Sequence, residues 1–473
     1  MQTNQLNSLM DKLDQNSTNS FYWSLTILAT LGGFLFGYDT ANIGSVLNFI
    51  PYHLGSLALG YLVAGASLGA AIGALAAGPI TDKFGRKSIL VFDAGLYALG
   101  AILSAFTVDA GMLLIARTLI GLAVGADSAI ATAYIAEYAP KNKRGKLSIL
   151  QQWMITVGIL ASYLIAAVIL SIFPKFVHSI DWRIILGLGA IPALLGLALR
   201  SRMPESPRWL LEHHQYEKLH KILNMLNIET SLDQVKTLSN QNDINFESHI
   251  NSKSSKSGIK KALLIASVFM IFQQLTGINI PLYYGPKILT PFFATHSSTI
   301  VSSAIQAVEA TAVLAAILVA SEYLAFRYID RFGRRYLAKI GFSGMAFFMI
   351  IAALGVSAFH GGSQALVMMI GFGGFLVFFS WGVGGTGWII QGEYFPTPVR
   401  GRMAATVATA DWLANFVLIQ IFPLMDKSIG LAGVMVVFSV LSLLAVLFVV
   451  KMMPETKGLS VEEIAELFQA QAR

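Results

Sequence analysis

Apolar stretches long enough to cross a membrane recur along the chain, and they constrain its fold more than any other feature. Because a bilayer core about 30 Å thick is crossed by roughly 20 residues of helix, each stretch is a candidate transmembrane helix. Twelve can be read: residues 22–44, 56–80, 88–108, 111–135, 147–172, 183–200, 261–287, 299–326, 336–359, 364–390, 402–424 and 429–452. We therefore predict an all-α membrane protein with twelve transmembrane helices. Because only 12% of residues are charged, about half the share of a soluble globular protein, a soluble enzyme is excluded.

The twelve stretches form two sets of six on either side of a polar segment, which is typical of a linker with short surface helices. The sequence predicts an N-terminal half over residues 1–200, a linker over 201–260 and a C-terminal half over 261–473. With the N-terminus inside, only about four of the 33 lysines and arginines fall outside: Lys175, Arg183, Lys287 and Lys427. By the positive-inside rule we expect a multi-pass protein of the cell membrane with both termini in the cytoplasm.

Three charged motifs of the first half recur in the second half in the same order. DKFGRK at residues 82–87 recurs as DRFGRR at 330–335, and PES at 204–206 recurs as PET at 454–456. Glu137-x6-Arg-Gly recurs as Glu393-x6-Arg-Gly. The two copies of these three motifs are separated by 248, 250 and 256 residues, respectively. Two six-helix halves related in this way predict pseudo-symmetric halves that rock around a central site.

The repeated motifs fall at the predicted cytoplasmic helix ends, where acids and arginines can pair across helices and lock one conformational state. The alternative is that these charges only anchor loops and set topology. The predicted gating residues are Asp82, Arg86, Glu137, Arg144, Glu205, Asp330, Arg334, Glu393, Arg400 and Glu455.

Asp39 lies inside an otherwise apolar stretch, where a carboxylate costs at least ~2.5 kcal/mol to insert, so we interpret it as functional. It is five residues from the outer end of the first stretch, and Arg117 is six from the outer end of the fourth. At about 1.5 Å per residue both sit ~8–9 Å deep, so an ion pair is predicted. Protonation of Asp39 would release Arg117 and couple proton entry to a conformational step. A structural ion pair without coupling is the alternative.

Amide side chains gather near the middle of the seventh stretch. Gln273 and Gln274 are about 12 residues in, which is ~18 Å deep. Gly277 and Pro281 should break the helix and free backbone groups toward a cavity, with Asn279 and Tyr283 on the broken part. Amides offer donors and acceptors without charge, which suits sugar hydroxyls. The alternative is that they join helices by hydrogen bonds.

Taken together in order, these motifs resemble the sugar porter family of the major facilitator superfamily. The resemblance runs from Gly32 to Glu463 and includes GGFLFGYD at residues 32–39, Arg117 with Gly121 and Gly125, PESPR at 204–208, QQLTGIN at 273–279 and PETKG at 454–458. The resemblance implies the major facilitator fold. It also implies a proton-coupling role for Asp39 and Arg117, because uniporters of the family usually carry a neutral residue at the position of Asp39. It also implies sugar contacts by Gln152, Gln273, Gln274, Asn279 and Trp388.

The chain departs from the family pattern at several positions near mid-membrane. Asp411 precedes Trp412 where the family usually has an uncharged polar residue, and we include both residues in the predicted substrate site. Leu318, Ile159 and Gly385 replace an Asn, an amide and a Pro, and Asp127, Glu309 and Glu322 are further acids without an obvious family counterpart. The extra carboxylates could bind sugar hydroxyls, add a proton site or accept a cationic substrate.

The leading hypothesis is a secondary active transporter that imports a monosaccharide, a hexose or pentose, with a proton. A proton-coupled carrier of an organic ion and an uncoupled sugar facilitator are the alternatives. A sugar sensor is disfavoured by the short segment after the last stretch, and an aspartyl protease because Asp127 follows Val-Gly-Ala rather than Gly-x-Gly. No cofactor, metal or nucleic acid is expected, since all eight histidines fall in loops or at helix ends and no Gly-x-x-x-x-Gly-Lys-Ser/Thr motif occurs. We expect a monomer in the lipid bilayer.

Overall fold

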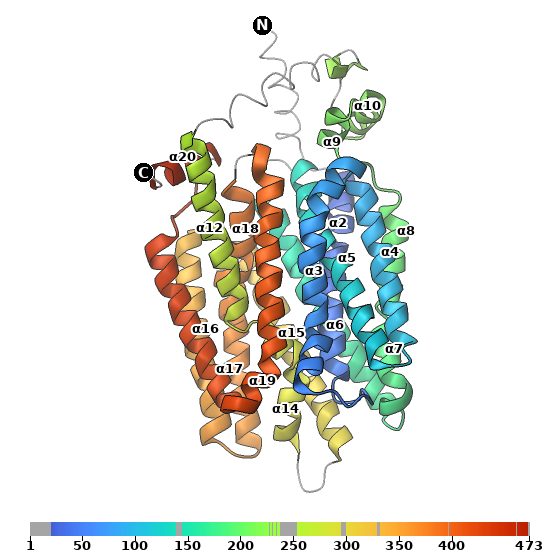
Figure 1. Cartoon of the computed structure of the whole chain (residues 1–473), viewed down its shortest axis with the longest axis vertical. Helices are drawn as coiled ribbons and strands as arrows, with labels where there is room; N and C mark the ends of the chain where they lie inside the picture. The colour runs from blue at the N-terminus through green and yellow to red at the C-terminus, as the bar shows by residue number, and fades with distance from the viewer. Residues whose placement is uncertain are drawn as a thin grey trace.

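The protein folds into a bundle of long helices (Figure 1). The computed structural model describes residues 20–138, 144–226, 228, 230–232, 234–236, 253–294, 299–328, 332–395, 397–459 and 461–471. Within these ranges the regular elements are all helical, as predicted.

The first half of the bundle contains α2 (Ser20–Val46), α3 (Ser56–Phe84), α4 (Arg86–Ala105), α5 (Ala110–Tyr138), α6 (Arg144–Ile172), α7 (Trp182–Gly187) and α8 (Ala190–Arg200). The second half contains α12 (Lys253–Leu275), α13 (Ile280–Tyr283), α14 (Gly285–Phe293), α15 (Ile300–Tyr328), α16 (Arg334–Ala358), α17 (Gly362–Phe379), α18 (Gly385–Glu393) and α19 (Thr397–Met452). The short helices α9 (Pro207–Glu212), α10 (Tyr216–Met225) and α20 (Val461–Gln471) lie at one end of the bundle, here called the linker end (Figure 1).

Ten segments of the described chain are long and apolar enough to cross a membrane. One of them, Gly401–Met452, has 52 residues, and at about 1.5 Å per residue it is more than twice as long as one crossing requires. Gly430, with φ 71° and ψ 162°, interrupts α19 and divides it into two crossings. Helix α2 is 27 residues long and makes a further crossing, although it carries Asp39, Thr40 and Asn42. Nine single crossings, two in α19 and one in α2 give the predicted twelve.

The seventh crossing is broken where the sequence predicts. Helix α12 ends at Leu275, and four residues of turn separate it from α13. Gly277 adopts φ +92°, and a Cβ atom there would lie 2.6–2.8 Å from the ring of Phe438. Only glycine tolerates both the left-handed backbone and the close ring. The break lets Asn279 turn away from the helix axis and toward the centre of the bundle.

Small residues let helices α3 and α5 approach closely, since Gly65, Gly69 and Gly73 follow one another at four-residue spacing along α3. A Cβ atom at Gly69 would lie 2.8 Å from the backbone nitrogen of Leu122, and glycines on α5 face the backbone of α3 in turn. This contact keeps the first half compact and fixes the position of α5, which carries Arg117.

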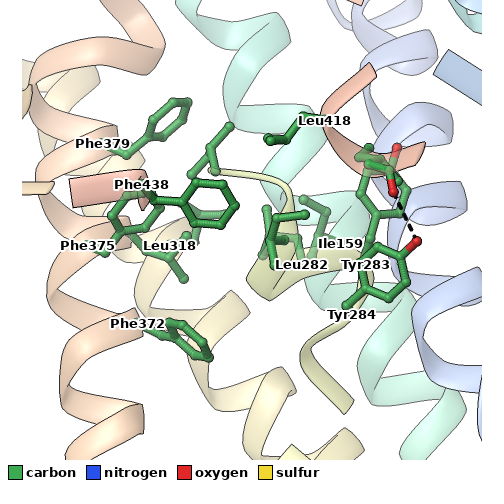
Figure 2. Close-up of a cluster of buried hydrophobic side chains, with 14 of the residues drawn as sticks. Ile159, Leu282, Tyr283, Tyr284, Leu318, Phe372, Phe375, Phe379, Leu418 and Phe438 are labelled. Atoms are coloured by element: carbon green, nitrogen blue, oxygen red, sulfur yellow. Dashed lines mark hydrogen bonds between the residues drawn. The ribbon is translucent and has the colours of Figure 1, made fainter. Parts of the chain in front are cut away.

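The core of the second half contains a group of aromatic side chains. Phe372, Phe375 and Phe379 follow one another along a single helix, α17, and meet Phe438 of α19 (Figure 2). Across the bundle, α3 packs against α19 and α6 packs against α15, so that these two contacts join the halves. Between them remains a cavity lined by both apolar and polar side chains.

Candidate functional site

A cavity at the centre of the bundle is lined by residues of both halves. Seven of the eight residues predicted to contact substrate line it: Gln152, Gln273, Gln274, Asn279, Trp388, Asp411 and Trp412. The other lining residues are Phe36, Thr40, Ile155, Thr156, Ile159, Ile278, Leu282, Leu318, Phe379 and Asn415. Uncharged amides over an apolar wall fit a small hydroxylated ligand.

Hydrogen bonds join the amides of the cavity into a network. The amide nitrogen of Gln274 donates to Asp411 Oδ1 at 2.8 Å, and Asn279 Nδ2 donates to Gln274 Oε1 at 2.9 Å. Asn279 Nδ2 also lies 2.9 Å from Asn415 Oδ1, and Asn415 Nδ2 donates to Ser67 Oγ at 3.0 Å. The network fixes the orientation of each amide and ties the cavity wall of α19 to α3.

A second polar contact crosses the cavity between the halves. Trp388 Nε1 donates to Gln152 Oε1 at 2.8 Å, which joins α18 to α6. Nearby, the buried oxygen Gln273 Oε1 has no hydrogen-bond partner among the described residues. Leaving a buried acceptor without a hydrogen bond costs free energy, and a ligand hydroxyl that donates to this atom would recover that cost.

The structure places Tyr283, the eighth predicted contact, away from the cavity wall. Its side chain is 1% exposed, and its hydroxyl lies 3.3 Å from Thr40 Oγ1 of α2. Tyr163 of α6 donates to the carbonyl of the preceding residue, Leu282. Tyr283 therefore joins the two halves at the end of the bundle opposite the linker end. Tyr283 is not among the residues that line the cavity, and its role as a substrate contact stays a prediction.

Asp39 of α2 and Arg117 of α5 form the ion pair that helix depth predicts. The two side chains are 2% and 0% exposed, and Arg117 Nε also donates to the carbonyl of Leu62 at 3.3 Å. Each charge compensates the other in an environment of low dielectric, so loss of one leaves the other exposed to the full cost of burial. The geometric prediction is confirmed, and the coupling role stays a prediction.

Asp39 is adjacent in sequence to Thr40, which lines the cavity and contacts Tyr283. Ionisation of Asp39 therefore changes the charge next to Thr40, which belongs both to the cavity wall and to the contact with Tyr283 between the halves.

At the linker end, the first copy of the charged motifs forms one cluster. Arg86 Nη2 lies 3.1 Å from Glu137 Oε1, and Arg86 Nη1 lies 3.5 Å from Asp82 Oδ1. Glu205 accepts hydrogen bonds from the backbone nitrogens of Arg86 at 2.8 Å and Lys87 at 3.1 Å. It thus caps helix α4, whose N-cap residue is a glycine without a side chain to do so.

Burial raises the pKa of Glu205 above the ordinary value of a glutamate, while the backbone N–H groups of Ser206, Lys87 and Arg86 oppose that shift. The carboxylate form is the one that caps the helix, because a protonated carboxyl accepts these bonds less strongly. This cap therefore weakens as the linker side is acidified.

The second copy of the motifs repeats the same geometry. Arg334 Nη2 donates to Glu393 Oε1 at 2.9 Å. Glu455 accepts from the backbone nitrogens of Arg334 at 2.9 Å and Arg335 at 3.1 Å, and so caps α16. Thr456 Oγ1 donates to Glu393 Oε2 at 3.1 Å, as Ser206 donates to Glu137 in the first half. The side chains of Arg144 and Arg400 and the whole of Asp330, also predicted in these clusters, lie outside what the structure describes.

The additional acids fall in different places. Asp411 lines the cavity, and Glu322 of α15 is fully buried beside Gln152 and Ser380. Glu309 is exposed on the outside of the bundle, so it does not reach the cavity. Among the described residues, no cation pairs with Asp411 or Glu322.

Asp127 joins an ion cluster that the sequence analysis did not foresee. Arg200 Nη1 lies 2.9 Å from Asp93 Oδ1 and 2.6 Å from Asp127 Oδ1, and all three side chains are buried. Asp93 and Arg200 have no place in the repeated motifs. Charge alone would have identified both of them, since each interrupts an apolar stretch or ends one.

Asn415 is a cavity residue that the predictions omitted. It lies one helical turn after Asp411, on the same face of α19, and this i, i+4 spacing could have identified it. Over the ranges that the structure describes, no group of three or more His, Cys, Asp or Glu side chains could hold a metal ion.

Comparison with known proteins gives a consistent result along the whole chain. Residues 25–468 match the family described as "Sugar (and other) transporter". The arabinose-proton symporter of Bacillus subtilis is 34% identical over 450 residues, which cover 94% of each chain. The D-xylose-proton symporter of Escherichia coli K12 is 32% identical and covers 96% of this chain and 97% of its own.

Solved structures of one relative resemble the fold as well. The proton:xylose symporter XylE bound to 6-bromo-6-deoxy-D-glucose superposes with a TM-score of 0.79 at 30% identity, covering 95% of this chain and 99% of that one. The partially occluded inward-open conformation of the E. coli xylose transporter gives a TM-score of 0.77, covering 93% and 99%.

Proposed function

The chain belongs to the family of sugar (and other) transporters, and from this premise we propose that it takes up a monosaccharide together with a proton by alternating access. The observation that carries the proposal is the central cavity, which is lined by uncharged amides and lies one residue from a buried acid–guanidinium pair. Two relatives named as sugar-proton symporters, one for arabinose and one for xylose, support the same substrate class and coupling.

In this proposal the sugar binds in the cavity between the halves. Gln274, Asn279 and Asn415 offer amide donors and acceptors, and Gln273 Oε1 accepts a hydroxyl. Trp388 and Trp412 present aromatic faces to the C–H face of the ring. Asp411 accepts from a sugar hydroxyl in addition to Gln274.

Asp39 carries the coupled proton. When it is ionised, it holds Arg117 and so fixes α2 against α5. When it is protonated, Arg117 keeps the carbonyl of Leu62 but loses its counter-charge, and α2 is released. Because Thr40 of α2 contacts Tyr283 of α13, release of α2 loosens the contact between the halves opposite the linker end.

The two charged clusters at the linker end stabilise the conformation in which the halves are closed at that end. We assign the linker end to the cytoplasm, because lysines and arginines are concentrated there, and residues 1–200 and 261–473 to the two rocking halves. The functional unit is a single chain in a cell membrane. A carrier of an organic ion and an uncoupled facilitator remain the outcomes that transport experiments must distinguish from this proposal.

The test is uptake into proteoliposomes with an imposed inward proton gradient, using labelled pentoses, hexoses and inositol. Accumulation that collapses with a protonophore is the expected result, and it identifies the sugar. Downhill movement that a protonophore leaves unchanged would make the protein a facilitator. Absence of sugar movement by folded protein would contradict the proposed substrate class and direct attention to ionic substrates.

A further inference from the structure

A second group of buried charges lies in the N-terminal half, apart from the Asp39–Arg117 pair. The guanidinium of Arg200, at the end of α8, contacts Asp93 of α4 and Asp127 of α5 at 2.9 and 2.6 Å. Arg200 also donates to the carbonyls of Leu28 and Ala29 on α2 and of Leu90 on α4, each at 3.1 Å. One guanidinium therefore joins four helices, and it serves two carboxyl groups.

The charges of this group do not balance. With both acids ionised, two negative charges face one positive charge, whereas Asp39 and Arg117 balance one to one. From α2 the site receives only backbone carbonyls, from α4 Asp93, from α5 Asp127 and from α8 Arg200. No other charged side chain of the described chain acts on Asp93 or Arg200. Two carboxylates that share one buried site cannot both stay ionised at little cost.

Hydrogen bonding points to the same conclusion independently. Asp93 Oδ2 is buried and has no hydrogen-bond partner among the described residues. Asp93 Oδ1 and Asp127 Oδ1 both contact the same nitrogen, Arg200 Nη1, at 2.9 and 2.6 Å, so the two carboxyl groups meet at one point. Ionised carboxylates only accept hydrogen bonds, so a bond between the two acids requires a proton on one of them. One proton on the pair of acids would leave one carboxylate to balance Arg200.

The position of the group suits exchange of that proton with the linker side. Asp93 is the eighth residue of α4, which begins at the linker end, so it is about 10 Å deep at 1.5 Å per residue. Asp127 lies ten residues beyond Arg117 on α5, which places the two sites roughly 15 Å apart along the same helix. One site is near each end of the N-terminal half.

The group is also close to the cavity. The Asp127 carboxylate occupies the space that a side chain at Gly32 of α2 would fill. The next residue, Ser128, accepts a hydrogen bond from Trp412 Nε1 at 3.4 Å, and Trp412 lines the cavity and contacts the ring of Phe36. Movement of α19 against α5 is therefore transmitted directly to the segment that holds Asp127.

We propose that Asp93, Asp127 and Arg200 form a second proton-binding site, in which the two carboxyl groups share one proton that exchanges with the linker side. This inference deepens the proposed transport function, but proton binding at the site does not depend on the identity of the transported sugar. Loss of the shared proton leaves a net negative charge beside α2, α4, α5 and α8, so proton occupancy and the packing of these helices are linked.

The test is infrared spectroscopy of the purified full-length protein near neutral pH, which detects the carbonyl stretch of a protonated carboxyl. Asp93→Asn and Asp127→Asn each leave one carboxylate to balance Arg200, so both variants are expected to fold. Each of the two variants should lose the same carbonyl band, and the lost intensity should correspond to one protonated carboxyl group. Asp109→Asn, an exposed acid, is the control and should leave the band unchanged.

Every outcome of the spectroscopic test decides the proposal. If neither variant changes the band, both acids are ionised and the site holds no proton. If only one variant loses it, the proton belongs to a single residue and is not shared. Loss of the same band in both variants supports the proposal even if no sugar is transported, which separates this result from failure of the proposed function.

A second readout tests exchange with the linker side. In proteoliposomes of defined orientation, efflux of the sugar identified by the uptake assay is measured as the pH on the linker side is varied. The wild-type protein should respond to that pH, whereas Asp93→Asn, which mimics the permanently protonated site, should lose the response but retain efflux. An unchanged response in Asp93→Asn would overturn the assignment of this site to proton exchange.

Discussion

The two halves of the molecule share their linker-end clusters but differ in the charges that they bury. In both halves an arginine pairs with a glutamate, and a second glutamate caps the following helix. Inside the bundle, the N-terminal half holds Asp39, Asp93, Arg117, Asp127 and Arg200, in which each arginine faces an acid. The C-terminal half holds the acids Asp411 and Glu322, which have no cation partner among the described residues.

This difference suits the two halves to different tasks, proton coupling in the N-terminal half and ligand binding in the C-terminal half. Paired charges can change their arrangement when a proton arrives, which suits coupling. Uncharged amides and a lone acid facing a cavity suit binding of a hydroxylated ligand. We expect the duplicated clusters to act alike in both halves, because their ion pairs and helix caps are the same. The predictions below test this division.

Asp39→Asn should have the largest effect on transport. The amide cannot ionise, so accumulation against a gradient should be lost while exchange of labelled sugar continues. Uptake and exchange in proteoliposomes measure the two activities separately, with Asp109→Asn as the matched control for an exposed acid. Equal loss of accumulation and exchange would remove Asp39 from coupling and make its pair with Arg117 structural.

Arg117→Leu should have the largest effect on stability. It leaves Asp39 buried without its counter-charge, and removal of one partner of a buried pair costs about 3–5 kcal/mol of unfolding free energy. Glu322→Gln, in the C-terminal half, breaks no ion pair of the described chain and should not lower stability. Reversible denaturation in detergent measures both values.

The double variant Asp39→Asn/Arg117→Leu sharpens that comparison. It carries no uncompensated charge, so it should recover most of the stability that Arg117→Leu loses. A double variant as unstable as Arg117→Leu alone would mean that the arginine acts through packing and its bond to Leu62 rather than through charge.

Gln274→Ala should weaken sugar binding without affecting coupling. The substitution removes the donor to Asp411 Oδ1 and one of the two acceptors of Asn279 Nδ2, at a cost of about 1–2 kcal/mol, or roughly 5- to 30-fold in Kd. Equilibrium binding of the identified sugar measures the change. Gln364→Ala, whose amide lies outside the cavity, should bind as the wild type does, and unchanged binding in Gln274→Ala would exclude it from the site.

The smallest effects are expected at the two helix caps, and they should be equal. Glu205→Gln and Glu455→Gln each remove a charge from a helix N-terminus, worth about 1 kcal/mol, so amide exchange in the first turn of α4 or α16 should accelerate about fivefold. Glu217→Gln, an exposed residue of α10, serves as the control. Acceleration in one half only would show that the repeated clusters differ in function.

Much of the fold is already determined by the sequence. The length of the apolar stretches sets the number of crossings, because each must span a bilayer of fixed thickness. Gly277 and Pro281 set the break in the seventh crossing, and the repeated motifs set the pairing of Arg86 with Glu137 and of Arg334 with Glu393. Depth along a helix follows from counting residues, and this was sufficient to pair Asp39 with Arg117.

Only the tertiary structure decided which side each buried residue faces. Counting gives depth but not rotation about the helix axis, so it could not direct Tyr283 to Thr40. Asp93, Asp127 and Arg200 lie 34 and 73 residues apart in the sequence and meet only because α4 packs against α5 and α8. Their shared site depends on contacts between helices, which no local pattern in the sequence encodes.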